Sequence, residues 1–137
     1  MVMVDSSIWI ELFRKDGDLL TSLAVEDLLE EMQATFCGVI KVEVLGGARP
    51  NERVTISNLF SLVPYLPMPE PGWDDVVKFQ WIAKKAGLTI PWSDAVIATL
   101  AQKSGCRVYA RDRHFDALGE HGLIELYRPG PGGSYTA

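Results

Sequence analysis

Apolar and polar positions along the chain alternate in blocks that predict strands separated by helices. Short apolar runs are typical of buried strands, whereas apolar residues spaced three or four apart indicate one face of a helix. We expect strands at 1–4, 34–38, 63–66, 107–110 and 124–127. We expect helices at 7–13, 20–32, 39–48, 51–62, 73–87, 91–105 and 112–118. Strands joined through helices form parallel sheets, so the order predicts an α/β fold with a central, mainly parallel sheet.

The length and composition are those of one domain with its own core. The chain has 137 residues, of which 47% are hydrophobic and 23% are charged, so disorder is not expected. We expect a single domain over residues 1–128. The last segment, PGPGGSYTA at 129–137, is expected to be a flexible C-terminal tail. The four tryptophans are expected to contribute to the core: Trp9, Trp73, Trp81 and Trp92.

Charge and targeting signals narrow the classes of function. The formal net charge is −5, which argues against a protein that binds nucleic acid through bulk charge alone. Asp5 interrupts the first apolar run, and no apolar run approaches the ~18–20 residues that span a bilayer. Cys37 and Cys106 form no CxxC motif and are expected to be reduced core residues. We therefore expect a cytoplasmic protein with no membrane partner.

Four acidic residues stand where a surface carboxylate is not expected. Asp5 and Asp112 each follow a predicted strand, and ligands of parallel α/β sheets bind beyond such strand ends. Glu43 and Asp94 lie in the apolar helical segments VIKVEVLGGA and PWSDAVIATLAQ, at positions expected to face inward. Each acid also has a structural interpretation, as a helix cap, a first-turn residue or an exposed helix side. Only the four together indicate a shared site.

Clustered carboxylates need a counter-charge. Burying an unpaired carboxylate costs several kcal/mol, and like charges raise each other's pKa unless a cation neutralises them. Few basic residues stand beside the four acids in the sequence. Carboxylate oxygens favour Mg²⁺ or Mn²⁺, whereas His114 and His121 lack the spacing of a zinc site. The pattern therefore predicts a Mg²⁺ or Mn²⁺ site.

Four segments resemble, in order, the acidic motifs of the PIN domain: VDSSIWIELFR, VEVLGGAR, IPWSDAVIATLAQKSG and VYARDRHFDALG. The similarity spans nearly the whole chain and is closest to VapC-type toxins, the ribonuclease half of bacterial toxin–antitoxin pairs. The resemblance implies a three-layer α/β/α sandwich around a mainly parallel sheet. It also implies an endoribonuclease that depends on Mg²⁺ or Mn²⁺ and hydrolyses RNA phosphodiester bonds.

The resemblance also assigns roles to the four acids. Asp5 and Asp94 would be the chief metal ligands, and Glu43 and Asp112 would complete the catalytic site as supporting ligands, partly through water. Two protein partners are implied as well: a cognate antitoxin and a second copy of the chain in a homodimer.

Residues next to these motifs are candidates for auxiliary roles. Ser6 matches the small hydroxyl residue that commonly follows the first aspartate of the family, and Asp116 lies one helical turn after the fourth acid. Arg111 and Arg113 are candidate contacts to the RNA backbone. The fourth motif has Ala110 where the family often has Thr or Ser, so a hydroxyl contact to water or phosphate is not expected there.

Two other functions fit parts of the pattern. An inactive PIN-like module would bind RNA or a protein without cutting, and the presence of all four acids argues against it. An aspartyl-phosphate phosphatase of the haloacid dehalogenase type would need a second aspartate two residues after the first, where Ser7 follows Asp5. Metal-dependent RNA cleavage that Asp5→Asn and Asp94→Asn abolish separates the ribonuclease from both.

Overall fold

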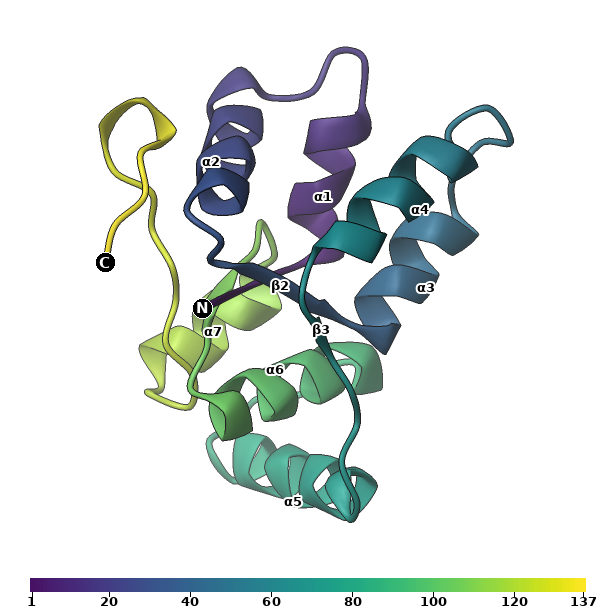
Figure 1. Cartoon of the computed structure of the whole chain (residues 1–137). Coiled ribbons are helices and arrows are strands. Elements are labelled where there is room, and N and C mark those ends of the chain that lie inside the picture. The colour runs from purple at the N-terminus through teal and green to yellow at the C-terminus, as the bar shows by residue number, and fades with distance from the viewer.

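Four short strands form one parallel sheet in the computed structural model, which describes all 137 residues (Figure 1). The strands are β1 (Val2–Val4), β2 (Ala34–Cys37), β3 (Tyr65–Leu66) and β4 (Arg107–Tyr109). They lie in the order β3-β2-β1-β4, and every neighbouring pair is parallel. The carboxyl ends of the strands therefore meet at one edge of the sheet, where ligands of such folds bind.

Helices cover both faces of this sheet. They are α1 (Ser6–Phe13), α2 (Leu19–Glu30), α3 (Gly38–Gly46), α4 (Arg53–Leu62), α5 (Gly72–Lys85), α6 (Trp92–Ser104) and α7 (Arg113–Glu120), followed by the 3-10 turn η1 (Pro131–Gly133). Figure 1 shows α1 to α4 on one side of the strands and α5 to α7 on the other. This arrangement confirms the predicted three-layer α/β/α sandwich. None of the helices combines the length and the apolar character needed to cross a bilayer.

The segment at 124–127 is not a strand, contrary to the prediction, and makes only an isolated parallel bridge to β4. The Val108 N–H donates to the Glu125 carbonyl, and the Tyr127 N–H donates to the Val108 carbonyl, each at 2.8 Å. The next donor in a parallel ladder would be residue 129. That residue is Pro129, which has no N–H, so the pairing ends there.

Helix α6 lies between the strands and α5 (Figure 1). Eight consecutive residues of α6, from Asp94 to Ala101, are buried. Helix α5 buries Val76, Phe79 and Ala83 and makes its most extensive helix contact with α6. The first turn of α6 therefore carries an aspartate into the interior of the molecule.

Three of the four tryptophans are exposed, which corrects the prediction that all of them contribute to the core. Trp73, Trp81 and Trp92 are 60%, 66% and 64% exposed, and only Trp9 is buried. Helix α5 has apolar residues on two faces, and the face that packs against α6 does not include its tryptophans. Periodicity locates an apolar face but does not say which of two faces meets the sheet layer.

The residues after 128 return to the surface of α2. Turn η1 contacts α2, Gly133 is buried, and the Tyr135 N–H donates to the Asp27 carboxylate. The Arg107 guanidinium donates to the Thr136 carbonyl at 2.8 Å. These contacts describe where residues 129–137 lie and not how they move, so their flexibility stays a prediction.

Candidate functional site

The backbone brings two of the four predicted acids to one edge of the sheet. Asp5 directly follows β1, Asp112 comes shortly after β4, and these two strands are neighbours. The Asp5 N–H donates to the Tyr109 carbonyl at 2.9 Å, which ties the two strand ends together. Both acids also cap helices, because Asp5 accepts from the Ser7 N–H at 3.1 Å and Asp112 from the His114 N–H at 2.8 Å. The cap and the proposed site thus use the same residues.

Asp94 reaches this edge from the first turn of α6. The residue is 8% exposed, and its only ion-pair partner is His114, at 3.1 Å. Burial raises the pKa of Asp94 from the ordinary 3.8 to about 6, with further contributions from the charges of Asp112 and Asp5. A carboxylate with this pKa stays ionised at neutral pH only at a cost in folding free energy.

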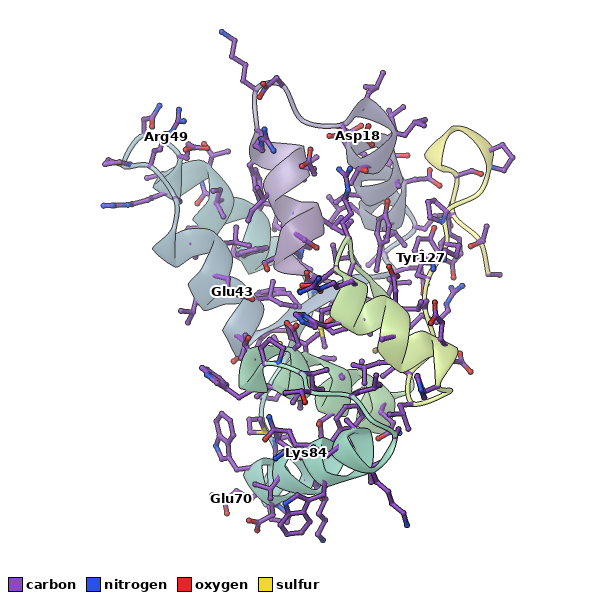
Figure 2. All side chains as sticks on the ribbon, turned by 180° about the vertical axis from the view of Figure 1, so that it is seen from behind. Asp18, Glu43, Arg49, Glu70, Lys84 and Tyr127 are labelled. Carbon is purple, nitrogen blue, oxygen red and sulfur yellow. The ribbon has the colours of Figure 1, made fainter.

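The carboxyl groups of Asp5 and Glu43 are perturbed in the same direction. Asp5 is 4% exposed, and burial raises its pKa. Glu43 lies on α3 (Figure 2) and is an exposed residue, contrary to the inward position predicted for it. Its Oε1 nevertheless accepts from the Ser6 hydroxyl at 3.1 Å, and desolvation together with the charges of Asp5 and Asp112 raises its pKa. The charge of Asp112 therefore acts on Asp5, Glu43 and Asp94 alike.

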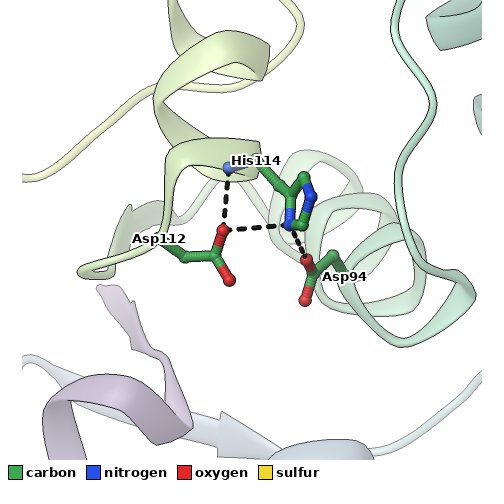
Figure 3. A group of neighbouring side chains, drawn as sticks. All are labelled: Asp94, Asp112 and His114. Atoms are coloured by element: carbon green, nitrogen blue, oxygen red, sulfur yellow. Dashed lines mark hydrogen bonds and ion pairs between the residues drawn. The ribbon is translucent and has the colours of Figure 1, made fainter.

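His114 joins the acids, and the sequence analysis missed it. Its ring Nδ1 lies 3.0 Å from Asp112 Oδ1 and 3.1 Å from Asp94 Oδ2 (Figure 3). These three side chains offer ligand atoms that all lie within 4.8 Å of one another. One signal in the sequence could have indicated it. Asp112 precedes a predicted helix, and an aspartate that caps a helix lies close to the residue two positions later, which here is His114. A search for paired histidines or cysteines could not detect a histidine that pairs with aspartates.

Ser7 is a second residue that the sequence analysis did not single out as part of the site. Its hydroxyl donates to Asp5 Oδ2 at 2.6 Å and accepts from the Arg111 N–H at 3.0 Å. It therefore fixes the Asp5 carboxylate and links the segments that follow β1 and β4.

The other candidates lie around the acids. Asp116 pairs with Arg128 at 3.6 Å, so its carboxylate is not brought to the other four. Arg111 is half-exposed and pairs with Glu11 at 3.5 Å. Arg113, the first residue of α7, is exposed and has no ion pair. Of the two arginines, only Arg113 has an uncompensated charge.

The donor set fits a divalent cation. No lysine or arginine lies within ion-pair distance of Asp5, Glu43, Asp94 or Asp112. The Nδ1 atom of His114 is buried and has no hydrogen bond of regular geometry. Carboxylates that no lysine or arginine neutralises, and a buried nitrogen without a hydrogen bond of regular geometry, are groups that a bound cation would satisfy. Such a cation would in turn attract a phosphate.

The geometry defines a class of protein, a parallel α/β sandwich with an acidic cluster at the carboxyl edge of its sheet. The profile of the PIN domain matches residues 2–121. The chain belongs to the PIN-domain family, which confirms the resemblance seen in its four motifs. It is similar to Ribonuclease VapC11 of Mycobacterium tuberculosis, with 33% identity over 128 residues that cover 86% of this chain and 91% of that protein.

Solved structures share the fold. FitAcB from Neisseria gonorrhoeae has a TM-score of 0.75 and 18% identity, and the match covers 93% of this chain and 97% of that chain. VapBC-5 from Mycobacterium tuberculosis, a member of the VapBC family of toxin–antitoxin systems, has a TM-score of 0.59 and 18% identity, covering 92% and 96%. At these identities the likeness supports the shared architecture alone.

Proposed function

We propose that this chain is an endoribonuclease that depends on Mg²⁺ or Mn²⁺ and is the toxin of a VapBC-type toxin–antitoxin pair. One observation carries the proposal: a buried aspartate, Asp94, lies among acids that no lysine or arginine neutralises. The similarity to a protein named as a VapC ribonuclease supports RNA as the substrate class. The motif resemblance supports Asp5 and Asp94 as the chief ligands, with Glu43 and Asp112 as supporting ones.

The residues of the chain would divide the work as follows. A bound divalent ion supplies charge neutralisation, activation of a water and stabilisation of the leaving oxygen. Ser7 holds the Asp5 carboxylate in place, and Ser6 orients Glu43. Glu43 is a candidate proton acceptor for two reasons. Its raised pKa makes its carboxylate a stronger base, and its exposure lets it reach a water. Arg113 is available to hold the RNA backbone beside the acids.

Metal removal tests this function. The purified chain is expected to cleave a mixed RNA substrate in Mg²⁺ or Mn²⁺ and to lose cleavage in excess EDTA, because the carboxylates would then repel phosphate. Gel analysis of the RNA fragments measures both, and re-addition of metal should restore activity. Cleavage that survives EDTA would contradict the proposal. RNA binding without cutting in either metal would instead indicate the inactive PIN-like module.

We also propose two protein partners, an antitoxin and a second copy of the chain. The similarity to Ribonuclease VapC11, together with the motif resemblance to VapC-type toxins, supports the first. Exposed apolar residues on α5 and α6, including Trp73, Trp81 and Trp92, offer apolar surface for either contact. Size-exclusion chromatography with light scattering is expected to give twice the mass of one chain at micromolar concentration. A strictly monomeric species would contradict the dimer.

A further inference from the structure

The imidazole of His114 is held in one orientation at the acidic cluster. His114 is the second residue of α7, and its backbone N–H donates to Asp112 Oδ1 at 2.8 Å. The ring Nδ1 lies 3.0 Å from the same oxygen and 3.1 Å from Asp94 Oδ2. Figure 3 shows this ring between the two aspartates. The first turn of α7 thus directs a nitrogen, and not only oxygens, into the site.

This nitrogen has neighbours but no satisfactory hydrogen bond. Nδ1 is buried, and neither carboxylate oxygen meets it with regular hydrogen-bond geometry despite the short distances. Buried polar atoms without a hydrogen bond are rare in folded proteins, because leaving one unsatisfied destabilises the fold. A cation shared with Asp94 and Asp112 would give Nδ1 the partner that the protein does not supply.

The separations also suit coordination. Two ligands at right angles on an ion with bonds of about 2.1 Å lie roughly 3.0 Å apart. The observed separations from Nδ1 to the two carboxylate oxygens are 3.0 and 3.1 Å. Both separations from Nδ1 therefore match those of neighbouring ligands on one ion, and all three ligand atoms lie within 4.8 Å of one another. Imidazole nitrogen is a poor ligand for Mg²⁺, which prefers oxygen, and a good one for first-row transition ions.

We infer that His114 Nδ1 is a metal ligand beside Asp94 and Asp112, and that the site consequently selects a first-row transition ion over Mg²⁺. The inference rests on the metal dependence of the proposed function and adds the identity of the ion. It also adds to the ligand set a histidine that the sequence analysis considered only for a zinc site, whose spacing it lacks. The competing interpretation is that the ring is a counter-ion for the two aspartates and leaves when metal binds.

Titration calorimetry of the full-length chain at neutral pH separates the two. We expect the unmodified chain to bind Mn²⁺ at least about tenfold more tightly than Mg²⁺. In His114→Ala, Mn²⁺ affinity should fall by about 10- to 100-fold, because removing even a residue that only supports a metal ligand causes losses of that size. Mg²⁺ affinity should change less than about threefold in the same variant. With Co²⁺ as the probe, the visible absorption spectrum should shift in the same variant because a nitrogen ligand is lost.

Two further variants serve as controls. His121→Ala removes the other histidine of the chain, whose ring contacts the Ala117 carbonyl at 2.9 Å away from the acids, and should bind both ions as the unmodified chain does. His114→Asn puts an amide oxygen near the position of Nδ1. It should retain Mg²⁺ binding and lose the preference for Mn²⁺, and it decides the question if the alanine variant does not fold.

Equal or tighter Mn²⁺ binding in His114→Ala would overturn the inference and identify the ring as a counter-ion. Equal losses for Mg²⁺ and Mn²⁺ in His114→Asn would overturn it as well. Because these measurements use metal alone, they are independent of RNA cleavage. A chain that selects Mn²⁺ through His114 but never cuts RNA would refute the proposed function and leave this inference standing.

Discussion

Replacing Asp94 by Asn is expected to abolish RNA cleavage and, at the same time, to stabilise the metal-free protein. Asn has the same shape but cannot neutralise a cation, so cleavage should fall by about 100- to 1,000-fold or more. The same change removes a buried charge that burial, Asp112 and Asp5 all disfavour, so the free energy of unfolding in EDTA should rise by about 1–2 kcal/mol. Cleavage rates and urea denaturation at neutral pH measure the two effects.

Asp74→Asn is the matched control for this variant. Asp74 is the third residue of α5, as Asp94 is the third residue of α6, so both face the same helix dipole. Asp74 is exposed and is not among the charges that raise the pKa of Asp5, Glu43 or Asp94. Its replacement should leave cleavage unchanged and alter stability by less than about 0.5 kcal/mol. Full activity in Asp94→Asn, or a loss of stability larger than that of the control, would count against the proposed site.

The metal-free protein is expected to lose stability as pH rises from about 4.5 to 6.5. The folded Asp94 has a pKa of about 6 against an ordinary value of 3.8, so over this range the folded chain retains a proton that the unfolded chain has released. Stability therefore falls with rising pH through this window and levels off above it. The raised pKa values of Asp5 and Glu43 act in the same direction. For Asp94 the fall should be about 2 kcal/mol.

Urea denaturation in EDTA at several pH values measures this slope. Groups with a lowered pKa, Asp18 and Asp75, contribute stability that is lost only below their ordinary value of 3.8, so they do not interfere above pH 4.5. The variant Asp94→Asn should lose most of this decrease in stability between pH 4.5 and 6.5. Saturating Mn²⁺ at pH 7.5 should restore stability, by about 2.7 kcal/mol at a concentration one hundred times its Kd. A stability that rises from pH 4.5 to 6.5 in EDTA would contradict the assignment of a strained acidic cluster.

The alternation of strands and helices could be predicted because each element carries its own pattern. β1 is buried on both faces and is an uninterrupted apolar run. β2 is buried as well, and its one polar residue, Thr35, donates its hydroxyl to the Pro64 carbonyl at 2.7 Å. The segment at 124–127, IELY, has the apolar residues of a strand, yet Pro129 limits its pairing to two hydrogen bonds. The number of hydrogen bonds depends on which strand the segment pairs with and in which register, and composition does not reveal either.

The exposed tryptophans illustrate a second limit. Trp73 and Trp81 share a helix face, which the pattern indicates correctly, but α5 turns that face away from α6. The direction depends on how Val76 and Phe79 fit against a neighbouring helix. Packing between helices therefore decided what periodicity left open.

The sequence by itself determined the class of fold, the family and the identity of four acids at strand ends and in apolar helices, because these depend on local pattern and on motifs read in order. The tertiary structure alone decided that His114 faces Asp94 and Asp112, that Ser6 and Ser7 hold Glu43 and Asp5, and that Asp116 pairs with Arg128. Asp94 and His114 stand 20 positions apart in the chain and on different helices. Their contact exists because α6 and α7 begin at the same edge of a folded sheet, and no local pattern encodes the distance between two helix starts.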